Sequence, residues 1–72
     1  MDVKQLFGHN VRKSRELRNW SQEKLAEHSG LHRTYISGIE RGVRNPTIEI
    51  VWEIAIALNV APSSLLESEE KQ

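Results

Sequence analysis

The sequence predicts a single, compact all-α domain of five short helices over residues 1–72. Two observations indicate this class. Apolar residues recur at helical spacing in several segments, and no segment alternates apolar with polar residues as a strand does. At this length, folding buries about 60% of the extended chain's surface, so we expect one small core. The sequence contains no cysteine, which excludes disulfides and thiolate metal sites.

The first two helices are bounded by residues suited to helix ends. The first spans about residues 3–18, and Asn19 is suited to the left-handed conformation that stops a helix. Its inward positions follow a helical spacing: Val3, Phe7, Val11 and Ser14. Ser21 is a good N-cap for the second helix, which Gly30 ends.

The other three helices are bounded in the same way. The third spans about residues 33–41 and ends at Gly42. The loop VRNP follows, because Pro46 disfavours helix in the residue before it. Thr47 caps a fourth helix through residue 58, and Pro62 opens a short fifth helix. The last five residues, SEEKQ, are polar, and we expect them to fray.

Three residues occupy the positions that a helix-turn-helix constrains most, within residues 21–42. Ala26 is small where the next helix crosses close by. Gly30 supplies the left-handed residue of a sharp turn, and Ile36 fills the angle between the two helices. Together they predict a helix-turn-helix.

The third helix has two unlike faces when residues 32–42 and their neighbours are placed on a helical wheel. The inward face holds Ile36, Ile39, Glu40 and Val43. The outward face lacks acids and consists of small or basic residues: Thr34, Ser37, Gly38 and Arg41, with Arg33 at its flank. Such a low-relief face suits close approach to an anionic surface, and the major groove of DNA admits one α-helix. The alternative is that Gly38 relieves crowding against a neighbouring helix.

The net charge of zero conceals an asymmetry along the chain. Residues 1–44 carry nine Lys or Arg and five acids (9 − 5 = +4), and residues 45–72 carry one Lys and five acids (1 − 5 = −4). This division indicates one face for a polyanion and another for something else, with chance clustering as the alternative. No apolar run approaches the ~20 residues of a membrane span, and no signal peptide precedes the first helix. We therefore expect a cytoplasmic protein that binds no membrane.

The segment VRKSRELRNWSQEKLAEHSGLHRTYISGIERGVRNPTIEI, followed by A--LNV, resembles the lambda-repressor-like (Cro/XRE) helix-turn-helix family. The resemblance covers about residues 7–66. HRTYISGIERG is more similar still to controller proteins of restriction–modification systems, which are small dimeric regulators of their own operons. A phage- or plasmid-type repressor is the alternative within this family.

The resemblance implies roles for particular residues. Gln22 would contact a DNA phosphate, and Arg33, Thr34 and Ser37 would read bases. Further contacts to the DNA backbone would come from three residues: Tyr35, Arg44 and Asn45. Arg15 and Glu40 would form a mostly buried salt bridge between the first and third helices. Two residues depart from the family pattern: Ser14 replaces a usually apolar residue, and His32 replaces the usual N-cap of the third helix.

The fourth helix is too apolar for the outer helix of a monomer. A core stripe needs only Ile48, Val51, Ala55 and Leu58. Ile50 fits the core equally well, whereas Trp52 and Ile56 are neighbours on another face. We expect these two residues to form a homodimer seam with Pro62 and Leu66, within a dimerisation region of about residues 47–68. A two-fold dimer would read two DNA half-sites.

Other functions find less support in the sequence. A protein-interaction module, such as an antitoxin, is the main alternative to a transcription regulator. An enzyme is disfavoured, because nucleophile motifs and phosphate-binding glycine loops are missing. His28 and His32 are four residues apart, but Gly30 interrupts any helix that would hold both towards a metal. We therefore expect no cofactor, metal or small-molecule effector, and double-stranded DNA and a second copy of the chain as the partners.

Overall fold

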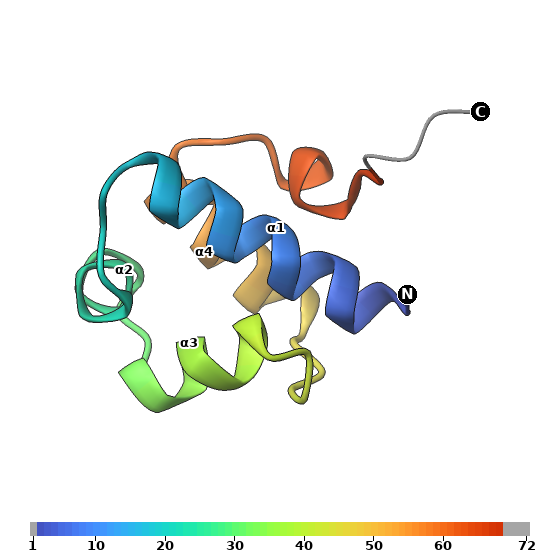
Figure 1. The fold of residues 1–72 in the computed structure, drawn as a ribbon, viewed down its shortest axis with the longest axis horizontal. Helices are drawn as coiled ribbons and strands as arrows, with labels where there is room; N and C mark the ends of the chain where they lie inside the picture. Colours follow the sequence, from blue (N-terminus) through green and yellow to red (C-terminus); the bar gives the residue numbers. More distant parts are fainter. Residues whose placement is uncertain (1, 69–72) are drawn as a thin grey trace.

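The computed structural model describes residues 2–68, and all regular structure in that range is helical. Four α-helices and one 3-10 helix follow in order (Figure 1): α1 (Val3–Leu17), α2 (Gln22–Ser29), α3 (Arg33–Glu40), α4 (Ile48–Leu58) and η1 (Pro62–Leu66). The all-α prediction is therefore confirmed, but the fifth helix is a short 3-10 segment. Of the SEEKQ segment expected to fray, residues 69–72 lie outside the described residues.

The helix boundaries are fixed by short-range hydrogen bonds. Ser21 Oγ accepts from the backbone N–H of Lys24 at 3.0 Å, and Thr47 Oγ1 caps α4 in the same way. His32 caps α3 through its Nδ1 atom, which accepts from the Thr34 N–H at 3.2 Å. Gly30 adopts a left-handed φ of 75°, which makes the tight turn between α2 and α3. The caps expected for α2 and α4 are confirmed, and the unusual His32 cap is effective.

The core lies between the helices and consists of nine buried apolar residues: Phe7, Val11, Leu25, Ile36, Ile39, Ile54, Ala55, Leu58 and Leu65. Figure 1 shows α1 across the middle of the molecule, with α4 behind it, α3 below it and α2, seen end-on, at the left. α1 packs on α3 and η1, while α2 packs on α3 and α4. This arrangement leaves one long side of α3 outside the core.

Three apolar residues expected on inward faces are exposed instead. Ile48 is 84% exposed, and Ile54 takes a core position that the sequence analysis left out. The inward stripe of α4 therefore begins at Val51 rather than at Ile48, and Ile50 and Val51 pack against the core from the first turn. Val43 is exposed because α3 ends at Glu40, before the wheel reaches it. Val3, in the first turn of α1, is also exposed.

Two residues of α1 that the sequence analysis missed fix the neighbouring elements. A Cβ atom on Gly8 would overlap the backbone carbonyl oxygen of Ile39, so the close crossing of α1 and α3 depends on a glycine there. Asn10 is buried, and its Nδ2 donates to the carbonyl oxygens of Leu65 at 2.9 Å and Glu67 at 3.0 Å. Gly8 thus allows α3 to pack closely against α1, and Asn10 holds the end of η1 against α1 by hydrogen bonds.

Candidate nucleic-acid interface

A buried ion pair joins the end of α3 to α1. Arg15 Nε donates to Glu40 Oε2 at 2.7 Å, and Arg15 Nη2 donates to Glu40 Oε1 at 2.9 Å. The two side chains are only 10% and 3% exposed. Arg15 also donates a third hydrogen bond, from Nη1 to the carbonyl oxygen of Trp20 at 2.7 Å. The hydrogen bond with Glu40 raises the pKa of Arg15 against the opposing effect of burial, so the pair favours the charged form of the guanidinium.

The ion pair continues into a chain of hydrogen bonds that reaches the start of α3. Gln22, the first residue of α2, donates from Nε2 to Glu40 Oε1 at 3.1 Å. Its Oε1 accepts from Arg33 Nη1 at 3.4 Å. Arg33 Nε also lies 3.8 Å from a carboxylate oxygen of Glu23. Gln22 therefore connects the buried carboxylate of Glu40 to an exposed arginine, a contact that the sequence analysis missed.

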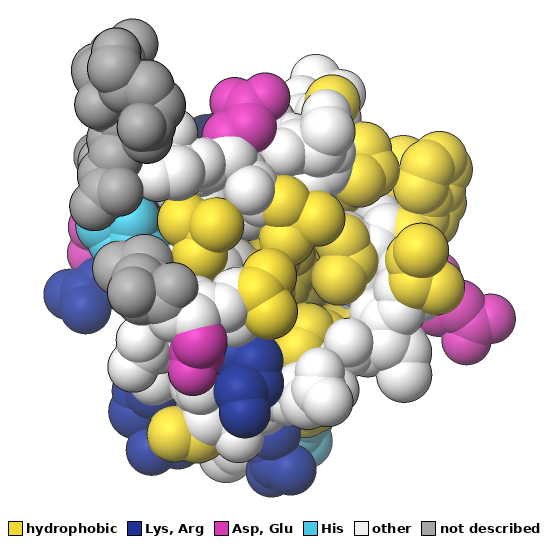
Figure 2. Space-filling model, turned by 90° about the vertical axis from the view of Figure 1, so that its right-hand side faces the viewer, with side chains coloured by type: hydrophobic (Ala, Val, Ile, Leu, Met, Phe, Trp, Pro, Cys, Tyr) yellow, Lys and Arg dark blue, Asp and Glu magenta, His cyan; other side chains and the backbone are white. Residues whose placement is uncertain are grey.

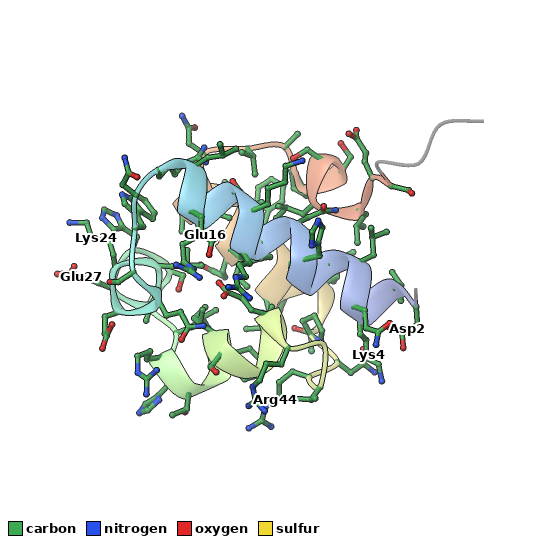
Figure 3. All side chains as sticks on the ribbon, in the orientation of Figure 1. Asp2, Lys4, Glu16, Lys24, Glu27 and Arg44 are labelled. Atoms are coloured by element: carbon green, nitrogen blue, oxygen red, sulfur yellow. The ribbon has the colours of Figure 1, made fainter. Side chains whose placement is uncertain are left out.

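The side of α3 away from the core presents polar and basic residues. Arg33, Thr34 and Arg41 are exposed, and Ser37 is half-buried. Arg44 and Asn45, in the loop after α3, are exposed as well. Figure 3 shows Arg44 beside α3, on the side away from α1. Residues of α3 and of the loop that follows thus share one surface.

Gly38 does not lie open on this surface, contrary to the low-relief strip expected from the wheel. It is buried, and its nearest neighbours are atoms of the Arg44 side chain. A Cβ atom at Gly38 would lie 2.7 Å from Arg44 Cγ and 3.2 Å from Arg44 Nε. The Arg44 guanidinium lies over the half-buried ring of Tyr35, 5.5 Å from its centroid. The loop after α3 therefore folds back and covers the middle of the helix face.

A separate apolar surface lies on α4. Trp52 and Ile56, the two expected seam residues, are 57% and 59% exposed, and Ile48 continues the same helix face one turn earlier. Leu66 of η1 is exposed, while Pro62 is half-buried. Ile50 is also half-buried and packs against the core, so it does not belong to this surface. In Figure 2 the apolar side chains occupy the centre and right, and Lys and Arg gather at the lower edge, the side of α3.

Residues 2–68 contain neither a cluster of potential metal ligands nor a membrane-spanning helix. No group of three or more potential His, Asp or Glu metal ligands is present among these residues. The helices of this range are all too short or too polar to cross a membrane.

The fold and these two surfaces define a helix-turn-helix protein. The profile of the helix-turn-helix family matches residues 11–65, and the chain belongs to this family. Control protein C.SmaI from Serratia marcescens is 50% identical over 66 residues, which cover 92% of this chain and 79% of that protein. Control protein C.BamHI from Bacillus amyloliquefaciens is 49% identical over 67 residues, covering 92% and 83% of the two chains.

The fold also matches a solved complex. The restriction-modification controller protein C.Esp1396I, a tetramer in complex with its natural 35 base-pair operator, superposes with a TM-score of 0.83 and 37% identity. The match covers 90% of this chain and 86% of that chain. The resemblance to lambda-repressor-like proteins and to controller proteins is thereby confirmed.

Proposed function

We propose that this protein is a transcription regulator that binds double-stranded DNA in a sequence-specific manner and acts as a homodimer. The observation that carries the proposal is the outward side of α3, where Arg33, Thr34 and Arg41 are exposed together and the inward side is buried. The left-handed Gly30 makes the tight turn between α2 and α3 that is typical of a helix-turn-helix. The operator complex of C.Esp1396I supports the same conclusion.

The residues of this surface divide into two roles. Arg33, Thr34 and Ser37 lie on the first two turns of α3, which meet base edges in such complexes. An arginine there can bond guanine O6 and N7 together, and the methyl group of threonine can meet that of thymine. The contacts to phosphates would come from residues around this centre: Gln22, Tyr35, Arg41, Arg44 and Asn45. Phosphate contacts set affinity and position, whereas base contacts set sequence preference.

The α4 surface supplies the dimer seam of the proposal. Trp52 and Ile56 offer a large exposed apolar area on one helix face, with Leu66 and Pro62 on the adjoining η1. Pairing this face with its copy about a two-fold axis would present two α3 helices to one side of the duplex. The operator would then be a palindrome or pseudopalindrome, with half-sites about 34 Å apart, one helical turn.

A finer proposal concerns the genes that the protein controls. Because two of its relatives are control proteins, we propose that it regulates its own operon beside restriction and modification genes, in the cytoplasm. Bound to its operator there, it would be associated with the nucleoid. Sequencing the adjacent genes tests this directly: a methyltransferase and an endonuclease gene are expected, and their absence would contradict the assignment.

Selection from random DNA, followed by fluorescence anisotropy, tests the DNA-binding proposal. We expect one enriched palindromic motif, and an affinity that falls steeply with salt because counterions are released from the contacted phosphates. Arg33→Ala should weaken binding to the motif more than to random DNA. Arg12→Ala, which removes the same charge from an exposed ion pair on α1, should change both affinities little. A pool with no enriched motif would refute sequence-specific binding.

Sedimentation velocity tests the seam. The wild-type protein should be a dimer at micromolar concentration, and Trp52→Glu should be a folded monomer, because a charge would be buried unpaired in the seam. Leu17→Glu provides the matched control, since Leu17 is 75% exposed on α1. Dimers that persist in Trp52→Glu, or that dissociate equally in Leu17→Glu, would place the interface elsewhere.

A further inference from the structure

We infer that Gly38 positions Arg44: the missing side chain leaves a slot across α3 that holds the Arg44 stem and places its guanidinium over Tyr35. This inference rests on the proposed function, because a placed Arg44 matters only if the α3 surface binds DNA. It also explains why a residue with poor helix propensity lies in the middle of a short helix.

The first step is the packing of the Arg44 stem. Gly38 is buried although it lies on the outward side of α3, and the three heavy atoms nearest to its missing Cβ are Cγ, Nε and Cδ of Arg44. At 2.7 Å from the Arg44 Cγ, a Cβ atom would displace that side chain. The neighbour is the middle of the arginine rather than its mobile tip. An alanine at this position therefore requires the Arg44 stem to shift from its place against α3.

The second step is the backbone that brings Arg44 to the slot. The Val43 N–H donates to the carbonyl oxygen of Gly38 at 3.0 Å, and the Gly42 N–H donates to that of Ile39 at 3.0 Å. These bonds fold the loop back along the last turn of α3. They fix the backbone position of Arg44, while the contacts with Gly38 and Tyr35 determine the direction of its side chain.

The third step is the placement of the charge. The guanidinium lies 5.5 Å from the centroid of the Tyr35 ring, within the range of a cation–π contact, and Arg44 as a whole remains exposed. An arginine held in this way loses less conformational freedom when it binds than one that moves freely in solvent. The slot therefore orders a basic contact before DNA arrives.

A double-mutant cycle on the selected operator tests the inference. We expect Gly38→Ala to weaken binding about tenfold through its coupling to Arg44. Arg44→Ala should weaken it at least as much, and the double variant should match Arg44→Ala alone. An equal loss from Gly38→Ala in both backgrounds would overturn the inference, because Gly38 would then act through its own contact with DNA. Unchanged binding by Gly38→Ala would overturn it as well.

A measurement on the free protein separates this inference from the proposed function. In the NMR spectrum the Tyr35 ring should shift the Arg44 side-chain protons upfield. The shift should persist in Tyr35→Phe, which keeps the ring, and disappear in Tyr35→Leu and in Gly38→Ala. Circular dichroism should show that Gly38→Ala stays folded, since alanine favours helix over glycine. An Arg44 shift that survives in Gly38→Ala would refute the slot, whether or not the protein binds DNA.

Discussion

Replacing Glu40 by glutamine removes the charge of the buried ion pair while keeping nearly the same shape. The Glu40 carboxylate accepts two hydrogen bonds from Arg15 and one from Gln22. In Glu40→Gln a single carbonyl oxygen remains as an acceptor, and the new NH2 group meets a donor. The guanidinium of Arg15, whose side chain is only 10% exposed, then loses its closest counterion and keeps only the carboxylate of Glu16, 3.9 Å away.

The expected loss is a large share of the protein's stability. Removing one partner of a buried pair costs about 3–5 kcal/mol, and small domains are stable by only about 5–15 kcal/mol. In a domain of this size that loss lowers the melting temperature by more than about 10 °C. Glu40 is the better residue to change, because a substitution of Arg15 would also remove the hydrogen bond to the Trp20 carbonyl.

Urea and thermal unfolding, followed by circular dichroism, measure the effect at one fixed protein concentration, since dimerisation adds to apparent stability. The matched control is Arg12→Gln, which breaks an i,i+4 pair with Glu16 that is more than half exposed on both sides and leaves the Arg15–Glu40 pair in place. This control should lose no more than about 0.5 kcal/mol. If Glu40→Gln unfolds at the same urea concentration and temperature as the wild-type protein or the control variant, the ion pair does not hold α1 and α3 together.

Three further substitutions test the packing and the hydrogen bonds that hold the helices in place. Gly8→Ala should destabilise the protein by about 1–3 kcal/mol or more in urea unfolding, because its Cβ overlaps the Ile39 carbonyl; a stable variant would mean that the two helices can move apart freely. Asn10→Ala should cost about 1–3 kcal/mol and speed hydrogen exchange after α4, since it leaves the carbonyl of Leu65 unpaired, and unchanged exchange would contradict this role. Thr47→Ala should cost about 1 kcal/mol by removing the N-cap of α4, and Thr47→Ser, which keeps the hydroxyl, should restore it.

Much of the fold was predictable because its signals are local. The N-cap hydrogen bonds of Ser21 and Thr47 join residues only three positions apart, so a short stretch of sequence contains both partners. The left-handed positions Asn19 and Gly30 also follow from single residues. The outward side of α3 was predictable for the same reason, since helical periodicity places Thr34 and its neighbours on one side.

Other predictions failed where a second segment decides the outcome. A helical wheel gives the spacing of α4 residues but not the rotation of the helix against its neighbours. The sequence analysis therefore placed Ile48 in the core and left out Ile54, whereas packing of α4 against α2 and η1 buries Ile54 and exposes Ile48. The hydrogen bond from Gln22 to Glu40 was not predicted either, because no sequence pattern indicates that the amide of Gln22 reaches that carboxylate; its contact with a DNA phosphate stays a prediction.

The sequence by itself determined an all-helical chain, the helix ends, the turn at Gly30 and a basic side on α3, because each depends on residues within about one helical turn. Only the tertiary structure decided what Gly38 does. On a helical wheel, the position of a glycine appears to leave open space beside the helix. In the structure, the side chain of Arg44, six residues later, fills that space. The reason is physical: the backbone bonds of the loop after α3 place Arg44, and the steric room at Gly38 then receives it.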